Sequence, residues 1–243
     1  MFNVLVACEE SQRVCIEFRK RGFNAYSCDI LDCSGGHPEW HIKLDCVCVL
    51  EGAIHFNTCD GKFHYVYNWD LIIAHPPCTY LTNTGNRWYN IEKYGDKAIN
   101  RFNERVKSID FFMNLTKCTC KHMAIENPIG CMSTIYRKPD QIIQPYMFGD
   151  RERKATCLWL KNLPKLEPTN IVEPNIIKYK NGKGTDSPWH MDTMKLPPSE
   201  RAKARSKTFP GIAEAMAKQW GDYLIMIDKQ ERMLNSSYYG MGV

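Results

Sequence analysis

The sequence predicts an α/β fold with a mostly parallel, doubly wound sheet. Short apolar runs of strand length alternate with stretches in which apolar residues recur at helical spacing, and this alternation is typical of parallel sheets covered by helices. With 243 residues, of which 44% are hydrophobic, the chain is long enough to bury one substantial core. We therefore expect one main domain.

The first part of the chain predicts a strand, a helix and a second strand. Residues 2–8 form an apolar run, and residues 11–21 carry apolar residues at helical spacing before Gly22 stops the pattern. Residues 23–28 form the next strand, which ends at Asp29. This order is the expected beginning of an alternating parallel sheet.

The central part of the chain adds two strands and one helix. Residues 69–74 form an apolar strand that Pro76 and Pro77 end, because proline cannot donate to the hydrogen-bond ladder of a sheet. Residues 98–117 carry the apolar stripe of an amphipathic helix covering the sheet, and residues 122–125 form another strand. Because parallel strands end at one edge, the polar residues that follow them should face one crevice.

The last part of the chain is less regular. Residues 154–160 predict a strand of an antiparallel pair, whereas residues 164–198 are rich in proline and show little periodicity, so we expect an extended excursion there. Residues 211–225 resume a helical pattern, and the last dozen residues should fray.

Charge is unevenly distributed along the chain. The total is +5, but residues 151–207 contain 13 Lys and Arg against 6 Asp and Glu, which leaves −2 for the rest. A basic segment of this kind suits a polyanionic partner such as nucleic acid, although it is also compatible with an ordinary solvated face.

The composition excludes several protein classes. No run approaches the roughly 20 apolar residues of a membrane span, and the N-terminus does not resemble a signal peptide. We therefore expect a soluble cytoplasmic protein in which the twelve cysteines are reduced thiols. The cysteines and histidines of residues 28–46 do not have the spacing of a zinc finger, so we expect no metal there.

Two residues at strand ends suggest a particular chemistry. A thiolate is a natural nucleophile for an electron-poor ring carbon, and the prolines before Cys78 hold it in one place. Glu126 follows an apolar strand, where desolvation should raise its pKa toward neutrality and allow it to donate a proton to a ring nitrogen. Together these groups suit cytosine: addition of the thiolate to carbon 6, with an acid at nitrogen 3, makes carbon 5 nucleophilic enough to accept a methyl group.

The same residues carry a family resemblance. Residues 70–78, Asp-Leu-Ile-Ile-Ala-His-Pro-Pro-Cys, and residues 125–127, Ile-Glu-Asn, resemble the Pro-Cys and Glu-Asn-Val motifs of the cytosine carbon-5 DNA methyltransferases. The chain resembles the short bacteriophage-encoded branch of methyltransferase-like proteins over roughly two-thirds of its length. The resemblance implies a Rossmann-like class I methyltransferase fold with a small irregular target-recognition excursion. It also implies S-adenosyl-L-methionine as cofactor, DNA as partner, a covalent Cys78 adduct assisted by Glu126, and the host cytoplasm as location.

The resemblance also implies a cofactor site. The turn of residues 7–11 stands where the family has a glycine-rich loop, and its two glutamates in place of glycines suggest contacts to the methionine ammonium. Asp29 matches the acidic residue that holds the ribose hydroxyls, and Asp45 matches the residue near the adenine amino group. The complete set implied for the cofactor is Ala7, Cys8, Glu9, Glu10, Ser11, Asp29, Ile30, Asp45 and Pro76.

For the substrate, the resemblance implies Pro77, Asn127, Arg87 and Lys154. Arg87 belongs to the loop that closes over the flipped base in the family, and Lys154 stands roughly where the family has an arginine near the target base. Residues 206–213 resemble the final motif that closes the cofactor pocket, with Ser206 in place of an asparagine, and Lys207 raises the alternative of a donor with a negatively charged transferred group.

The resemblance divides the chain into a methyltransferase catalytic domain and one insertion. We assign residues 1–138 and 201–243 to the catalytic domain and residues 139–200 to a small basic target-recognition insertion. Two alternatives stay open: an enzyme that modifies a pyrimidine in RNA or in a free nucleotide, and a catalytically silent protein that only binds nucleic acid.

Overall fold

The protein is built on a seven-stranded sheet, seen in a computed structural model that describes residues 1–52, 54–179 and 184–239. The strands of this sheet, in spatial order, are β3 (His41–Lys43), β2 (Asn24–Asp29), β1 (Asn3–Ala7), β6 (Leu71–Ala74), β7 (Met123–Pro128), β9 (Thr156–Lys161) and β8 (Gln141–Ile143). The first five are parallel, and β9 is antiparallel to both of its neighbours. This mostly parallel sheet, with its one reversed strand inserted near the edge, has the order of Rossmann-like methyltransferases, so the predicted fold class is confirmed.

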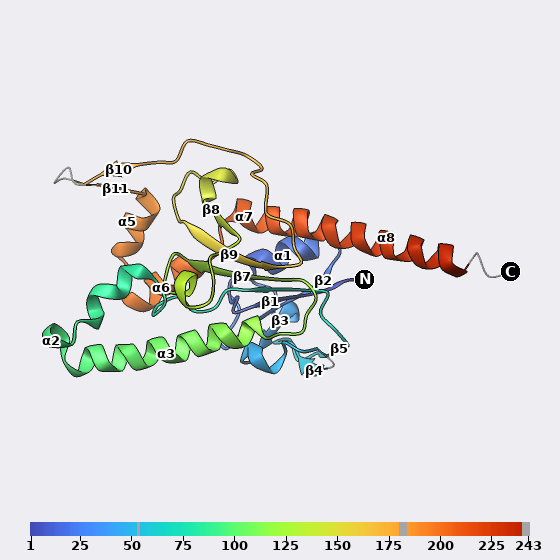
Figure 1. The fold of residues 1–243 in the computed structure, drawn as a ribbon, viewed down its shortest axis with the longest axis horizontal. Helices are drawn as coiled ribbons and strands as arrows, with labels where there is room; N and C mark the ends of the chain where they lie inside the picture. Colours follow the sequence, from blue (N-terminus) through green and yellow to red (C-terminus); the bar gives the residue numbers. More distant parts are fainter. Residues whose placement is uncertain (53, 180–183, 240–243) are drawn as a thin grey trace.

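Helices cover both faces of the sheet (Figure 1). They are α1 (Arg13–Lys20), α7 (Pro210–Ala215) and α8 (Gly221–Tyr239), which share one hydrophobic core, and α3 (Asp96–Thr116), which belongs to the other. The alternation of side chains along β1 links the two cores. Val4 and Val6 pack with the first group of helices, whereas Leu5 and Ala7 pack on the side of Phe112 of α3.

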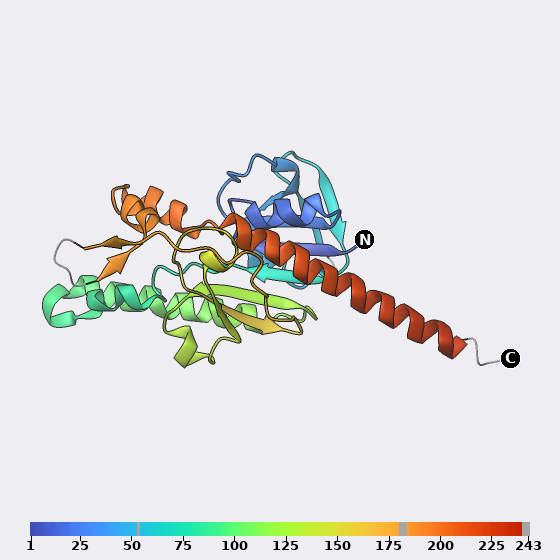
Figure 2. The ribbon, with the colours of Figure 1, turned by 90° about the horizontal axis from the view of Figure 1, so that it is seen from above.

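The remaining elements lie in the connections. Along the chain they are the 3₁₀ turns η1 (Pro38–Trp40) and η2 (Cys46–Cys48), the hairpin of β4 (Ile54–Asn57) and β5 (Phe63–Val66), η3 (Asn83–Tyr89), α2 (Ile91–Tyr94), α4 (Met132–Ile135), η4 (Pro145–Met147), the hairpin of β10 (Ile177–Lys178) and β11 (Thr185–Asp186), α5 (Pro188–Met194), α6 (Pro198–Ser206) and the π-helical turn η5 (Met216–Trp220). Figures 1 and 2 both place α2, α5 and the β10–β11 hairpin at one end of the molecule, while α8 projects from the other.

The helix predicted over residues 98–117 exists as α3, but the prediction that its whole apolar stripe covers the sheet is wrong. Ile99, Phe102 and Val106 are 44%, 57% and 42% exposed. The N-terminal half of α3 extends beyond the sheet toward α2, so it has no sheet to cover (Figure 1). The large buried side chains of α3 come from the C-terminal half, where Phe112 and Leu115 are fully enclosed, and in the N-terminal half only the small Ala98 is buried among the described residues.

Two further expectations need correction. The segment 164–198 is expected to be irregular, yet it contains the β10–β11 hairpin and α5, and α6 begins at Pro198. The division into a catalytic domain and an insertion over residues 139–200 stays a prediction; this range contains β8 and β9 of the main sheet. The last dozen residues were expected to fray, but α8 is helical as far as Tyr239, and residues 240–243 lie outside the described residues. The membrane search of the described helices found none with the length and apolar character of a membrane span.

Candidate active site

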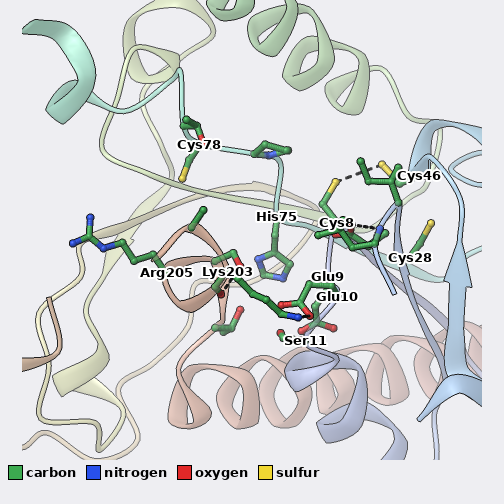
Figure 3. A pocket seen from close by; sticks show the side chains of 18 of the residues that line it. Cys8, Glu9, Glu10, Ser11, Cys28, Cys46, His75, Cys78, Lys203 and Arg205 are labelled. Carbon is green, nitrogen blue, oxygen red and sulfur yellow. Dashed lines mark hydrogen bonds and ion pairs between the residues drawn. The ribbon is translucent and has the colours of Figure 1, made fainter. Parts of the chain in front are cut away.

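A cavity of about 630 Å³ opens at the carboxyl ends of the parallel strands. Its walls come from the segments that follow β1, β2, β3 and β6, together with α6 and Phe111 of α3. Loops at these strand ends carry the ligands of doubly wound proteins, because the strands separate there and leave a crevice. Figure 3 shows Cys78 on one side of the cavity and Glu10, Cys8 and Cys46 on the other.

The loop after β6 holds Cys78 through contacts on both sides. Asn127 Nδ2 donates to the Pro76 carbonyl at 2.8 Å, and the amides of Leu81 and Thr82 donate to the Cys78 carbonyl at 3.0 and 3.1 Å. Cys78 lines the cavity and is partly buried. Burial raises the pKa of its thiol and the negative charge of Glu126 adds to this, whereas the positive charge of Lys154 lowers it.

Glu126 is coupled to the cavity through His75. Its Oε2 lies 3.1 Å from His75 Nδ1, and both side chains are largely buried. The predicted raised pKa of Glu126 is wrong for this structure: burial does push the pKa upward, but the hydrogen bond with His75 and the positive charge of Lys154 outweigh it, and the pKa is lowered. Glu126 is therefore a carboxylate at neutral pH.

Lys154 lies close to these groups. Its Nζ donates to the Arg205 carbonyl at 2.8 Å, which ties the start of β9 to α6. Glu126, Asn127 and Lys154 do not line the cavity themselves. Glu126 contacts His75, Asn127 contacts Pro76 on the loop of Cys78, and the charge of Lys154 acts on the thiol. The structure therefore brings this part of the predicted site together around Cys78.

Two residues of the turn after β1 adopt a left-handed backbone conformation that glycine favours. Cys8 and Gln12 adopt left-handed φ angles of 59° and 58°. Such a conformation costs a residue with a Cβ roughly 1–2 kcal/mol, so the surrounding contacts must hold it in place. Gln12 is fully buried, and its side-chain amide both donates to the His37 carbonyl and accepts from the His37 amide.

The two glutamates of this turn have different surroundings. The carboxylate of Glu9 accepts from the amides of Val14 and Cys15 at 2.7 and 3.2 Å, and so satisfies two free donors at the start of α1. Burial, partly offset by the electrostatic interaction with His75, raises the pKa of Glu9 to about 7. Glu10 is also buried, but neither of its carboxylate oxygens has a hydrogen-bond partner in the described structure, and its nearest cation is Lys203 Nζ at 3.7 Å.

The other predicted cofactor residues divide into two groups. Ser11, Asp29, Ile30 and Asp45 line the same cavity as Cys8, Glu9 and Glu10. Ala7 and Pro76 do not line it; the Ala7 carbonyl accepts from the His75 amide at 2.9 Å and thereby joins the end of β1 to the loop that carries Cys78.

Arg87 lies outside the cavity. It is exposed on η3, with its guanidinium 4.9 Å from the centre of the Trp88 ring. A second hollow of about 600 Å³ lies between η3 and α3, and its walls include Tyr80, Trp88 and Arg101. Pro77 is exposed and lines the main cavity.

Comparisons with known proteins assign no family to this chain. No protein-family model matches the chain, and no curated protein matches it. The chain is similar to a solved structure of a prophage-encoded protein from E. coli that has been proposed to be a DNA modification methyltransferase, with 14% identity and a TM-score of 0.43. The match covers 82% of this chain and 56% of that one, so the chain spans little more than half the length of that protein.

Sequence reasoning missed the residues that α6 contributes. Arg201, Lys203 and Arg205 all line the cavity, yet the chain before them was expected to be irregular. A signal was present: Pro198 at the first helical position and Glu200 in the first turn are typical of a helix start. The role of His75 was also missed, because the motif around it drew attention only to Cys78.

The cysteines and histidines of residues 28–46 have other partners in the structure. Nowhere in the described ranges do three His, Cys, Asp or Glu side chains gather in a way that could hold a metal ion. His41 is buried and engages the Ser27 hydroxyl and the Leu31 carbonyl, and Cys46 lies 3.6 Å from Cys8, sulfur to sulfur. These contacts explain the cluster of histidine and cysteine as packing around the cavity.

Proposed function

We propose that this protein is an S-adenosylmethionine-dependent methyltransferase that modifies carbon 5 of cytosine in DNA through a covalent adduct with Cys78. One observation carries the proposal: one cavity, at the strand ends where this fold binds ligands, is lined by the buried carboxylate of Glu10, which accepts no hydrogen bond in the described structure, and by the thiol of Cys78. A cofactor and a nucleophile can therefore occupy the same cavity.

The residues on the acidic side of the cavity fit the cofactor. A buried carboxylate without a hydrogen bond is costly, and an ammonium group would satisfy it, so Glu10 would hold the methionine ammonium. Asp29 and Asp45, which follow β2 and β3, would accept hydrogen bonds from the ribose and the adenine. S-adenosylmethionine would supply an electrophilic methyl group at this position.

The residues on the other side fit a cytosine ring. Cys78 would add to carbon 6 as a thiolate, which the positive charge of Lys154 favours. Glu126, which contacts the cavity residue His75, would act on nitrogen 3 of the bound ring. A bound base would exclude more water from this carboxyl group and push its pKa upward, which is the direction that a proton donor to the ring needs.

Positive charge near the cavity supports a polyanionic substrate. Arg201, Lys203 and Arg205 present three cations along α6, inside the most basic segment of the chain. Phosphates of a nucleic acid would be attracted to this wall, and an extruded base would then reach Cys78. DNA is the substrate proposed here; RNA and a free nucleotide are the outcomes that the experiment separates.

The test is transfer of a labelled methyl group. The purified protein is incubated with methyl-tritiated S-adenosylmethionine and, in parallel, duplex DNA, RNA or dCTP, and the products are digested to nucleosides. The proposal expects label in 5-methyl-2′-deoxycytidine from DNA and no label with Cys78→Ala. Label only in RNA or in the free nucleotide would change the substrate, and DNA binding without transfer to any substrate would support a silent binder.

A further inference from the structure

A base is needed to complete the proposed reaction. After Cys78 has added to carbon 6 and carbon 5 has accepted the methyl group, carbon 5 still carries its original hydrogen. The ring recovers its double bond only when that proton leaves, its bonding electrons form the bond between carbons 5 and 6, and the bond from carbon 6 to the Cys78 sulfur breaks to release the thiolate. Neither Cys78 nor Glu126 takes this proton in the scheme above.

His75 has the geometry of such a base. Its side chain is only 6% exposed and lines the same cavity as Cys78, which follows on the same loop. Nδ1 faces Glu126 Oε2 at 3.1 Å, whereas Nε2 is buried without any hydrogen-bond partner in the described structure. In the view of Figure 3 its ring lies between Cys78 and the pair of Glu9 and Glu10.

The partner of Nδ1 determines what Nε2 can do. A carboxylate only accepts hydrogen bonds, so the ionised Glu126 requires the proton of a neutral imidazole to be on Nδ1. The lone pair of Nε2 is then directed away from Glu126 and is free to accept a proton. A carboxylate that orients an imidazole in this way also stabilises the imidazolium that forms.

We propose that His75 is the base that removes the proton from carbon 5 of cytosine. The inference rests on the proposed function and adds a residue to it. Among the described residues that line the cavity, His75 is the one histidine. The lining carboxylates are Glu9, which is occupied by the amides of α1, and Glu10, Asp29 and Asp45, which the cofactor engages in the proposed function.

The charges around His75 favour proton uptake. Glu126 is its direct partner, and Glu9 lies near enough for the two groups to attract each other. Glu10 lines the same cavity and is paired with Lys203, while Lys154 acts on Glu126 and Cys78. The negative charge of Glu126 would therefore stabilise an imidazolium at position 75, and Glu9 would add to this when Glu9 is ionised.

The test separates formation of the adduct from its resolution. Wild type, His75→Asn and His75→Ala are each given S-adenosylmethionine and DNA that contains either cytosine or 5-fluorocytosine. Fluorine at carbon 5 blocks the final step, so the adduct on fluorinated DNA requires no base. His55→Asn, an exposed histidine of β4, serves as the matched control.

Both His75 variants should form the fluorinated adduct within a few-fold of the wild-type rate. On ordinary cytosine they should transfer one methyl group per protein and then remain attached to DNA, with steady-state turnover lower by about 10²–10⁴-fold. An equal loss of the fluorinated adduct would overturn the inference, because His75 would then only position Glu126. Unchanged turnover would overturn it as well.

Rescue by imidazole guards against misfolding of the variants. The methylated adduct of wild type is isolated and its decay is compared with that of the His75→Ala adduct in the absence and presence of added imidazole; imidazole should speed release from the variant and leave wild type unchanged, and a variant that releases DNA as fast as wild type without imidazole contradicts the inference. Failure of the wild type to form any adduct with fluorinated DNA would instead contradict the proposed function itself, and the inference with it.

Discussion

The two sides of the cavity differ in charge. The side formed after β1, β2 and β3 carries Glu9, Glu10, Asp29 and Asp45, whereas the side formed by the β6 loop and α6 carries His75, Arg201, Lys203 and Arg205. They meet where Lys203 faces Glu10 at 3.7 Å. A cationic cofactor and an anionic polymer need opposite surroundings, so this division lets one cavity receive both, and the cofactor ammonium would replace Lys203 at Glu10.

The largest expected effect is a loss of methyl transfer when the thiol of Cys78, on the basic side, is removed. Binding of the cofactor on the acidic side should not change. Cys78→Ala should reduce methyl transfer by on the order of 10⁴-fold or more, because the covalent step is lost. Its affinity for S-adenosylmethionine, measured by calorimetry, should stay within about twofold, because the methionine ammonium is held on the other side. A variant that retained transfer would break the assignment of the nucleophile.

The acidic side contains a glutamate whose ionisation makes the stability of the fold depend on pH. The pKa of Glu9 is about 7 in the folded protein, so the folded state keeps a proton that the unfolded chain loses at lower pH. Its contribution is complete below pH 4.5 and is lost as the pH rises to 7, by about 3 kcal/mol. Urea unfolding at pH 5 and pH 8 should show this fall in stability.

Glu9→Gln should reduce the difference between the two pH values, because glutamine does not ionise. Glu17→Gln on α1 is the control and should keep the wild-type difference. An unchanged difference in Glu9→Gln would assign the pH dependence to other groups.

The second glutamate should act on the cofactor. Glu10→Gln removes the charge that would pair with the methionine ammonium, and the dissociation constant for S-adenosylmethionine should rise about 10–100-fold. Binding of DNA, measured without cofactor, should change little. Glu92→Gln, exposed on α2, should bind the cofactor as wild type does. Equal affinities for the two variants would contradict the acidic side as the ammonium site.

The charge of Lys154 acts on two residues near the basic side of the cavity. Its positive charge lowers the pKa of both Cys78 and Glu126, so Lys154→Gln should raise both. The thiolate fraction at pH 7 falls, and adduct formation should slow about tenfold and recover at higher pH. The pH profile of the adduct rate in wild type and variant measures this shift, and superimposable profiles would show that Lys154 does not act on the thiol.

The smallest effect is expected at Arg87, outside the cavity. Arg87→Ala should weaken DNA binding a few-fold and reduce the slope of log affinity against log salt by about one, as loss of a single phosphate contact does. Lys121→Ala, which faces Glu231 on α8, provides a matched loss of charge elsewhere. If both variants bind DNA equally well, η3 does not contact DNA.

The sequence predicted the fold better than the site because the two depend on different information. Strands β1, β2, β6 and β7 are short apolar runs that end at polar residues, and local pattern alone identifies them. The lowered pKa of Glu126 depends on His75 and on Lys154, which is brought near by the pairing of β9 with β7. No local pattern contains that pairing.

The contribution of α6 was hidden for a similar reason. Arg201, Lys203 and Arg205 read as ordinary surface charge in the sequence, and only the fold of the chain over the cavity gives them a role. Cys78 was found because prolines and an apolar strand mark its position locally. The position of its thiol relative to Glu10 depends on the tertiary structure, which no local sequence pattern encodes.

The most direct test of the central claim is to map the adduct within the protein. Wild type is trapped on 5-fluorocytosine DNA in the presence of S-adenosylmethionine, digested with protease and nuclease, and analysed by mass spectrometry. We expect the nucleotide on the peptide that contains Cys78, with the additional mass of one methyl group, and on none of the other eleven cysteines. An adduct at another cysteine, or one at Cys78 without the methyl group, would contradict the account in which a single cavity brings cofactor and nucleophile together.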